Sequence, residues 1–531
     1  MARDKGSKTV INIPLTFNAA TYFVDRHHSE GRGGSVAIEC GDERVTYAQL
    51  LERTNRTGNA LRKLGVRMEE RVALLLLDSP EFLYGFFGAI KIGAVAVPMN
   101  TYLQAQDYEH LLNDSRARVL VVHDVLLPLF HLIPRERLRY LEHIVVAGRS
   151  RAGSLEELMS TESPRLEATP TSTDDAAFWL YSSGSTGTSK ACIHLHHDML
   201  ICSELYAKNI LHLTEGDRCY SVARLFFAYG LGNAGYYPLS CGATTLLSRA
   251  RPEPAAIYNN IERYRPTLFF SVPSNYAALL DHHREDGREF DLSSVRYGIS
   301  AGESLPAPLF ERFKSRFGVE ILDGLGSTEA LHIVISNCPG EVRPGSSGKV
   351  IPGYEAKLVD DEGNDVAQGE IGSLLVQGDS ICAGYWNRHE KTKAAFDGAW
   401  FRTGDKYYQD EDGYFWYAGR ADDLFKVNGR WLNPAEVESA LIAHPAVQEA
   451  AVIAREDANH LTKPAAYVVV RQSFLGNAEL ARNLQDWVMD KIGAYKRPRW
   501  VEFLPELPKT ATGKLQRYKL RELQAGSSNP L

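Results

Sequence analysis

The feature that most constrains the fold is an alternation of short apolar runs with helical patterns along residues 36–150. Buried strands are predicted for the apolar runs, which lie at 72–77, 94–99, 119–124 and 143–148. A helix is predicted between the first two runs, over 81–93. Continuous runs rich in β-branched residues, separated by helices of about 10–15 residues, are typical of βαβ units in a parallel sheet. The sequence therefore predicts an α/β fold.

The same alternation returns around 244–248, 267–273 and 295–303. Two successive βαβ-type sheets, or one very wide sheet, fit the large N-terminal part. From about residue 345 the chain changes to short strands punctuated by glycine, at 355–365 and 370–378. These predict turns and a small antiparallel, barrel-like subdomain.

The segment after 419–423 mixes both kinds of element. Its predicted helices and strands are 435–443, 446–454, 464–470 and 477–492, and a loop-rich end follows them. This pattern predicts a small α+β domain on a short linker. We therefore expect an N-terminal domain over 1–421 and a C-terminal domain over 422–531.

Charge and composition narrow the class of protein. Among the 531 residues, acidic side chains outnumber basic ones by 66 to 59, so nucleic acid is disfavoured as the main partner. The N-terminus has no apolar run typical of a signal peptide, and the apolar stretch 82–97 contains Lys91 and is too short to span a bilayer. Seven cysteines without a CxxC pair predict reduced thiols rather than a disulfide framework or a zinc site. The sequence predicts a soluble, cytoplasmic protein that binds small molecules.

A loop of glycines and hydroxyls directly follows a predicted strand. Residues 181–190 read YSSGSTGTSK. Glycines let backbone N–H groups approach an anion, hydroxyls donate further hydrogen bonds, and Lys190 adds positive charge. The spacing is not that of a Walker loop. The loop is either a phosphate-binding loop or a flexible surface loop.

Four further segments carry candidate residues. Residues 323–333 place Thr328, which can hold a phosphate, beside Glu329, which is either a Mg²⁺ ligand or a solvated charge at a helix start. Asp405, in FRTGD, is either an acceptor for ribose hydroxyls or an ordinary turn residue. Residues 419–438 and 507–517 contain clustered charges and a Gly-Lys turn, and each alone also fits a salt-bridged linker or an exposed tail.

Taken together and in this order, these segments resemble the acyl-adenylate-forming superfamily of acyl- and aryl-CoA synthetases, adenylation domains and luciferases. The resemblance covers about residues 20–520. The segments LFFAYGLGNA (225–234), GSTEALHIVISN (326–337) and LPKTATGKLQRYKL (507–520) are most similar to the benzoate-CoA ligase group. The phosphate loop departs from the family at Ser189 and Ala191, where Pro and Gly are common around the lysine.

The resemblance implies a ligase that joins a carboxylate to ATP and then transfers the acyl group to CoA, with Mg²⁺ on the phosphates. It implies that the outer phosphates are held by Ser182, Ser183, Gly184, Ser185, Thr186, Gly187 and Lys190. It places Lys514 between the carboxylate and the α-phosphate, Thr328 on the α-phosphate, and Glu329 on Mg²⁺. It further assigns the ribose to Asp405 and Arg420, and the surroundings of adenine to Ala301, Gly302, Glu303 and Asp323.

The same resemblance implies that the C-terminal domain rotates about Asp422 between the two half-reactions. Rotation withdraws Lys514 and presents Lys426 and Gly429 to the pantetheine arm of CoA. A glycine suits such a narrow passage because its bare backbone leaves room.

The residues that match the acyl pocket of the family are Phe227, Ala228, Tyr229, Ala301, Gly324, Leu325, Gly326, His332 and Ile333. Ala228 stands where relatives that take amino acids carry an aspartate, so an ammonium would be buried unpaired. The pocket is therefore expected to take benzoate and, because an added hydroxyl is weakly rejected, hydroxybenzoates as well. Tyr229 and His332 either bind a ring hydroxyl or pack and bond elsewhere.

Two other readings stay open at this point. The chain could load a carrier-protein thiol with an aryl acid, or it could be a nucleotide-binding interaction protein without activity. The oligomeric state, a homodimer included, is left open.

Overall fold

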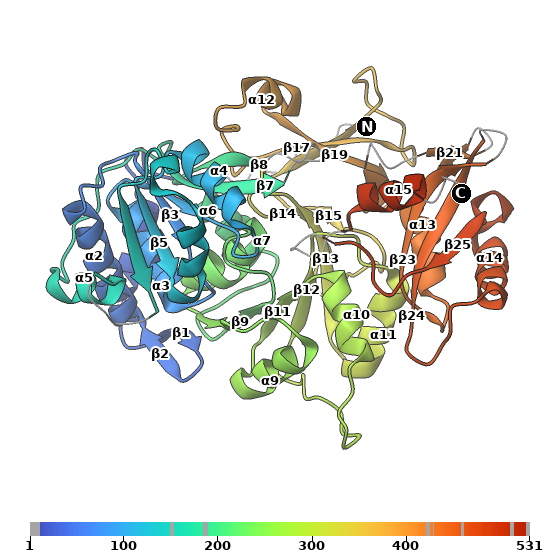
Figure 1. Ribbon diagram of the computed structural model, residues 1–531, viewed down its shortest axis with the longest axis horizontal. Helices are drawn as coiled ribbons and strands as arrows, with labels where there is room; N and C mark the ends of the chain where they lie inside the picture. The colour runs from blue at the N-terminus through green and yellow to red at the C-terminus, as the bar shows by residue number, and fades with distance from the viewer. Residues whose placement is uncertain are drawn as a thin grey trace.

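The computed structural model describes residues 11–148, 153–183, 189–420, 425–427, 430–457, 461–509 and 515–526. Two large sheets build the N-terminal part, and smaller sheets follow toward the C-terminus (Figure 1). The α/β fold with a large N-terminal and a small C-terminal unit is confirmed. The open choice between one wide sheet and two is settled in favour of two.

The first large sheet has six strands. Its order is β6 (His143–Ala147), β5 (Val119–His123), β3 (Arg71–Leu75), β4 (Val95–Pro98), β7 (Ala176–Ser183) and β8 (Ser189–Leu195). All neighbours pair in parallel except β7 and β8, which form an antiparallel hairpin. The central strands β3, β4 and β5 are buried on both faces, which explains their continuous apolar runs.

The second large sheet has nine strands. Its order is β15 (Lys349–Val350), β14 (Ile333–Ser336), β13 (Glu320–Gly326), β12 (Tyr297–Ser300), β11 (Leu268–Ser271), β9 (Arg218–Ser221), β10 (Thr244–Leu247), β1 (Val36–Cys40) and β2 (Glu43–Thr46). The centre from β13 to β1 is parallel, whereas both edges are antiparallel. The hairpin from β13 into β14 was not foreseen from the sequence, and it carries most of the candidate residues near 330.

Helices cover the two large sheets. They are α1 (Arg26–Ser29), α2 (Tyr47–Lys63), α3 (Pro80–Lys91), α4 (Ala105–Ser115), α5 (Leu155–Thr161), α6 (Asp198–Cys202), α7 (Ala228–Leu231), α8 (Tyr237–Cys241), α9 (Pro254–Tyr264), α10 (Pro273–Asp281) and α11 (Ala307–Phe317). Short π- or 3₁₀-helical turns lie at Thr21–Asp25, Asp124–Leu132, Arg135–Arg137, Ser203–Lys208, Gly232–Tyr236 and Ala494–Lys496. Helix α2 starts with a capping box, in which Thr46 and Gln49 bond each other's backbone N–H.

Helix α3 accounts for the apolar stretch 82–97. Every residue of this helix except Glu81 is buried, and even Lys91 is 1% exposed. Its ammonium lies 2.7 Å from Oδ1 of Asp25. Within the described residues, no helix combines the length and the apolar character that a membrane crossing requires.

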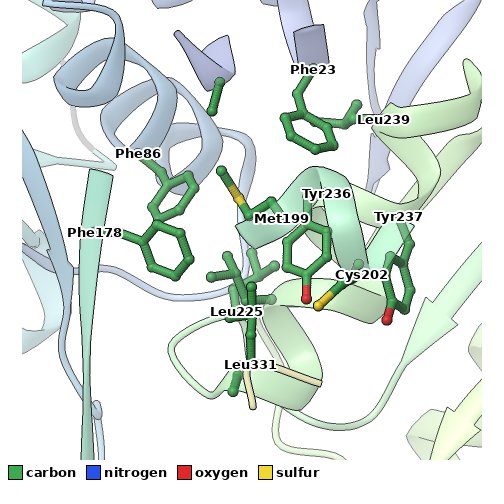
Figure 2. Close-up of a cluster of buried hydrophobic side chains, with 14 of the residues drawn as sticks. Phe23, Phe86, Phe178, Met199, Cys202, Leu225, Tyr236, Tyr237, Leu239 and Leu331 are labelled. Carbon is green, nitrogen blue, oxygen red and sulfur yellow. The ribbon is translucent and has the colours of Figure 1, made fainter. Parts of the chain in front are cut away.

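The main core lies between the two large sheets. Figure 2 shows Phe86 of α3 beside Phe178 of β7, with Met199 and Leu225 next to them and Leu331 at the edge of the group. Elements that are far apart in sequence therefore share one apolar cluster. This cluster fixes the position of the turn that contains Leu331.

Smaller sheets make up the rest of the chain. An antiparallel sheet contains β16 (Glu355–Val359), β17 (Gly372–Gln377), β18 (Phe396–Asp397), β19 (Trp400–Gln409) and β20 (Phe415–Arg420), with α12 (His389–Ala395) beside it. The C-terminal unit contains β21 (Phe425–Val427), β22 (Arg430–Leu432), α13 (Pro434–Ile442), β23 (Val447–Glu456), β24 (Thr462–Val470), α14 (Ala478–Ile492), β25 (Trp500–Phe503) and α15 (Arg517–Gly526). The end expected to be loop-rich thus supplies a strand, which pairs in parallel with β24, and a helix.

Candidate nucleotide and acyl site

The β7–β8 hairpin places the basic end of the predicted phosphate loop. Ser182 pairs with Lys190 and Ser183 with Ser189 across the hairpin. The strands therefore hold Lys190 at the edge of the segment 184–188. The predicted ligands Gly184, Ser185, Thr186 and Gly187 lie outside the described residues, and of Ser183 only the backbone is described.

Lys190 and Glu329 form the electrostatic centre of the site. The ammonium of Lys190 lies 2.9 Å from Oε1 of Glu329, whose side chain is 10% exposed. Burial raises the pKa of the Glu329 carboxyl, but the charge and hydrogen bond of Lys190 outweigh this effect and leave that pKa below its ordinary value. Glu329 is therefore a carboxylate at neutral pH, not a solvated helix-start charge.

Tyr385 completes this centre and was missed in the sequence. Its hydroxyl donates to Oε1 of Glu329 over 2.8 Å and accepts from Lys190 over 2.6 Å. Burial, followed by the negative charge of Glu329, raises the pKa of Tyr385, so the hydroxyl keeps its proton. The short sequence signal GYW at 384–386 gives no sign that a tyrosine 56 residues after Glu329 reaches it.

The turn after β13 carries Thr328 and Glu329. The Thr328 carbonyl accepts a hydrogen bond from Nε2 of His194, 2.9 Å away, and the Glu329 carbonyl accepts one from the Cys382 N–H, 2.7 Å away. The backbone of both predicted ligands is thus held by neighbouring segments. The structure brings Lys190, Thr328 and Glu329 together, as expected.

The site suits a metal that arrives with its substrate. No cluster of three or more His, Cys, Asp or Glu side chains fit to bind a metal occurs in the part of the chain that the structure describes. A single carboxylate, Glu329, stands beside the hydroxyl-bearing Thr328. Because Mg²⁺ prefers one or two carboxylates plus substrate phosphates and water, this donor set fits Mg²⁺ bound to a nucleotide.

Asp405 and Arg420 face each other across β19 and β20. They are register partners, and Nη1 of Arg420 lies 3.1 Å from Oδ1 of Asp405. The same guanidinium nitrogen donates to the Thr403 carbonyl over 3.2 Å. The pair predicted to bind the ribose is therefore assembled on one side of the antiparallel sheet, and an ordinary turn role for Asp405 is excluded because it lies within β19.

Asp323 and the segment 301–303 lie at the ends of neighbouring parallel strands. Ser300 of β12 pairs with Asp323 of β13, and Ala301, Gly302 and Glu303 follow directly. Ligands of open α/β sheets bind at this edge. Burial raises the pKa of Asp323 to about 8, and its Oδ2 accepts a hydrogen bond from the Leu305 N–H over 3.3 Å.

The C-terminal tail reaches this edge. Lys509 pairs with Leu515 in an antiparallel bridge, and the Leu515 N–H donates to Oε1 of Glu303 over 3.0 Å. The residue next to Lys514 is thus bonded to the predicted adenine segment. Lys514, Asp422 and Gly429 themselves lie outside the described residues, and only the backbone of Lys426, in β21, is described.

The residues predicted to line the acyl pocket gather around His332. Its ring lies 5.4 Å from the Tyr229 ring, centroid to centroid, and Gly232 lies so close that an added Cβ would stand 2.3 Å from His332 Cδ2. Gly326 pairs with Ile333, and a Cβ on Gly324 would stand 2.7 Å from Ile333 Cγ2. The two glycines let β14 approach β13 closely. Phe227, Ala228 and Leu325 pack against or within the same core.

The Tyr229 hydroxyl and one ring nitrogen of His332 have partners within the protein, whereas Nδ1 of His332 is buried without a hydrogen-bond partner among the described residues. The Tyr229 hydroxyl lies 3.2 and 3.1 Å from the carbonyls of Ser271 and Ile299. Nε2 of His332 lies 3.0 Å from Oδ1 of Asn233. Burial lowers the pKa of His332 to about 3, so its ring is neutral at physiological pH. Tyr229 thus bonds elsewhere, and the pocket side chains carry no charge.

Two sheets that meet at a paired lysine and glutamate, with a C-terminal tail bonded nearby, are the arrangement expected of an adenylate-forming enzyme. The sequence comparisons agree with this class. The family model described as "AMP-binding enzyme" matches residues 25–386, and that described as "AMP-binding enzyme C-terminal domain" matches 436–514. The chain belongs to the AMP-binding enzyme family, within the acyl-adenylate-forming superfamily.

Individual relatives are similar over almost the whole chain. A benzoate–CoA ligase of Thauera aromatica is 46% identical, with 98% of this chain and 99% of that protein covered. A 4-hydroxybenzoate–CoA/benzoate–CoA ligase of Rhodopseudomonas palustris is 42% identical, with 97% and 96% covered. The crystal structure of the anthranilate CoA ligase AuaEII with anthranoyl-AMP superimposes with a TM-score of 0.93 at 44% identity, covering 97% of this chain and 99% of that one.

Proposed function

We propose that the protein is an AMP-forming aryl-acid–CoA ligase that converts benzoate, ATP and CoA to benzoyl-CoA, AMP and diphosphate. Hydroxybenzoates are expected as further substrates. The observation that carries the proposal is the set of uncharged side chains around His332, at positions that match the family's acyl pocket, in a chain similar over almost its full length to ligases of benzoates. A flat aryl acid can enter this pocket without leaving a charge unpaired.

The pocket side chains support an aryl ring over an amino acid. Ala228 is 7% exposed and offers no carboxylate, and His332 is neutral. An α-ammonium group would be buried without a counter-charge, which costs several kcal/mol (roughly). A ring hydroxyl can be accommodated, because pockets of this kind reject an added hydroxyl by only about 10²-fold.

In the first half-reaction, the substrate carboxylate attacks the α-phosphate of ATP and diphosphate leaves. Negative charge grows on both phosphate groups, so fixed positive charge and hydrogen-bond donors accelerate the step. Lys190 supplies charge at the outer phosphates, and Thr328 supplies a hydroxyl at the α-phosphate. Mg²⁺, when bound at Glu329, neutralises phosphate charge. We place Lys514 between the carboxylate and the α-phosphate.

In the second half-reaction, the CoA thiol attacks the acyl carbonyl and AMP leaves. The thiol needs the space that Lys514 covers in the first step. We propose that the C-terminal domain, from 422, turns about Asp422 and brings Lys426 and Gly429 to the pantetheine passage. The Leu515–Glu303 hydrogen bond is characteristic of the first pose, because it holds the tail beside the nucleotide segment.

A panel of aryl acids tests the proposal. The purified chain is mixed with ATP, Mg²⁺, CoA and benzoate, each of the three hydroxybenzoates, anthranilate or an amino acid, and AMP and thioester are both measured. Benzoyl-CoA with matching AMP is expected, and the amino acid gives neither. ATP-dependent acylation of an added carrier protein, with release of AMP and without any CoA product, would instead establish carrier loading, and no AMP from any acid would indicate a nucleotide-binding protein without activity.

We also propose a cytoplasmic location. ATP and CoA are available there, and all seven cysteines are free thiols, five of them buried. Such thiols are stable in a reducing compartment.

A further inference from the structure

The turn that carries Thr328 and Glu329 is fastened at three consecutive carbonyls. The Thr328 oxygen accepts from His194, the Glu329 oxygen from the Cys382 N–H, and the Ala330 oxygen from the Ser380 hydroxyl, over 2.9, 2.7 and 2.9 Å. The donors come from β8 and from the segment near Tyr385. A turn held in this way presents its side chains in one fixed direction.

The turn needs such support because its backbone is strained. Leu331 has a φ of 67°, in the left-handed region that non-glycine residues rarely adopt. Its side chain is fully buried in the core, where Figure 2 shows it near Leu225. The buried leucine and the three donors therefore define this conformation together.

His194 is the one side chain among these donors that is itself held by a carboxylate. Because a carbonyl has no proton to give, Nε2 of His194 carries the hydrogen. Its Nδ1 lies 2.8 Å from Oδ2 of Asp198, which also accepts the Leu195 N–H over 3.1 Å. Both side chains are 0% exposed, and the His194 ring stacks on Phe178 at 5.1 Å.

The pair of His194 and Asp198 can hold the backbone of the predicted phosphate-binding turn in place. In the proposed reaction, Glu329 exchanges its contacts with Lys190 and Tyr385 for the metal that ATP brings. The carboxylate can exchange partners without displacing Thr328 only if the backbone between them stays in place. The hydrogen bond from His194 to the Thr328 carbonyl supplies that restraint at the residue that binds the α-phosphate.

We infer that His194, oriented by Asp198, is a positioning residue for the Mg²⁺–ATP half of the site. It acts through the Thr328 carbonyl and touches neither nucleotide nor aryl acid. The inference rests on the proposed function, because it assigns Thr328 and Glu329 to Mg²⁺–ATP. The inference gives His194 and Asp198 no role in the acyl pocket, and the variants described below leave the residues of that pocket unchanged.

The test compares substitutions at His194 and Asp198 with a matched one at His196. His194→Met removes the donor at similar volume, His194→Gln retains an N–H donor, and Asp198→Asn removes only the orienting charge. His196 is a suitable control because it is equally buried, lies on the same segment, and bonds the Ala19 N–H instead of the turn. Each variant is measured in benzoate-dependent ATP–diphosphate exchange, and binding of Mg²⁺–ATP is measured separately by calorimetry.

We expect His194→Met to raise the Mg²⁺ half-saturation and the KM for ATP about tenfold, as loss of an outer partner of a metal ligand commonly does. The KM for benzoate should stay within twofold. Calorimetry should show the same loss of Mg²⁺–ATP affinity, His194→Gln should restore most of it, and Asp198→Asn should fall between. His196→Met should lower thermal stability without changing either nucleotide parameter.

Contrary outcomes are distinguishable. Equal changes in the KM for ATP and for benzoate, no rescue by His194→Gln, or the same nucleotide defect in His196→Met would overturn the inference while leaving the ligase proposal intact. If His194→Met does not fold, Asp198→Asn and His194→Gln are compared instead, again by the change in the KM for ATP relative to the KM for benzoate. A wild-type chain that binds Mg²⁺–ATP but forms no adenylate with any aryl acid would refute the proposed function, and the calorimetric comparison would still decide the role of His194.

Discussion

The ammonium of Lys190 and the carboxylate of Glu329 lie 2.9 Å apart, although one belongs to β8 and the other to the turn after β13. Each group is assigned to a different part of Mg²⁺–ATP. In the structure they neutralise one another, and Tyr385 bridges them. Nucleotide binding must therefore exchange this buried ion pair for new partners of opposite charge.

Breaking the pair from one side should destabilise the fold. Lys190→Met leaves Glu329 buried without its counter-charge, and we expect a loss of about 3 kcal/mol in the free energy of unfolding. The double variant Lys190→Met/Glu329→Gln should recover part of that loss, because no lone charge remains. Urea unfolding measures both. The exposed pair Arg402–Asp397 is the control, since Asp397→Asn should change stability by less than about 0.5 kcal/mol. Strictly additive effects at 190 and 329 would contradict the coupling.

Tyr385→Phe removes one hydroxyl and nothing else from the same centre. We expect a loss of about 1–2 kcal/mol in unfolding free energy, because a hydrogen bond to a buried charged group disappears. The same change should weaken Mg²⁺–ATP binding less than Glu329→Gln does. Tyr140→Phe, at a residue that is 45% exposed, serves as the control and should be neutral. A Tyr385→Phe variant as stable as wild type would show that the hydroxyl contributes nothing.

Gly232→Ala should disturb the acyl pocket. Its Cβ would stand 2.3 Å from Cδ2 and 2.7 Å from Nε2 of His332, so the imidazole, which is bonded to Asn233, or the helical turn must shift. We expect about 1–3 kcal/mol of destabilisation from overpacking and a raised KM for benzoate, with the KM for ATP almost unchanged. Gly216→Ala is the matched control, because the nearest atom to its added Cβ lies 3.8 Å away. An unchanged KM for benzoate would separate His332 from the pocket.

Asp323 predicts a pH dependence of stability. Burial raises its pKa from 3.8 in the unfolded reference to about 8 in the folded chain. Between these values the folded state binds one proton more than the unfolded state, so this group's contribution to stability falls as pH rises from about 4 to about 8. Asp323→Asn cannot titrate. Its stability relative to wild type should therefore increase between pH 5 and pH 8 in urea unfolding, and a constant difference would contradict the raised pKa.

The two proposed poses predict opposite defects for two lysines. Lys514→Ala should slow adenylate formation by about 10²–10³-fold and spare thioester formation from supplied benzoyl-AMP. Lys426→Ala should spare adenylate formation and slow the thioester step. Pre-steady-state measurement of each half-reaction decides. Equal losses in both half-reactions for either variant would refute the assignment.

The sequence predicted the fold well where burial acts on both faces of a strand. The apolar runs at 72–77 and 119–124 became β3 and β5 almost to the residue, because a strand buried on both sides leaves a continuous apolar pattern. The β13–β14 hairpin left no comparable signal. Its tight pairing depends on Gly324 and Gly326, and glycines at this spacing are typical of a loop when only the sequence is considered.

The candidate site shows the same division. Lys190, Thr328 and Glu329 could be predicted because each lies in a compact motif. Tyr385 and His194 could not, because their roles depend on contacts across 56 and 134 positions of the chain. Asp405 and Arg420 were assigned through resemblance, and only the register of β19 and β20 gives a physical reason for their proximity.

A second contact joins the C-terminal unit to the N-terminal part besides the bond between Leu515 and Glu303, because Arg471 pairs with Asp281. Both must open each time that unit leaves the nucleotide edge. Dissolved ions weaken the ion pair between Arg471 and Asp281 more than the hydrogen bond from the Leu515 N–H to the Glu303 carboxylate. If release of the C-terminal unit limits the rate of turnover, moderate salt should therefore raise that rate. If the chemical step at the α-phosphate is rate-limiting, salt should not raise it.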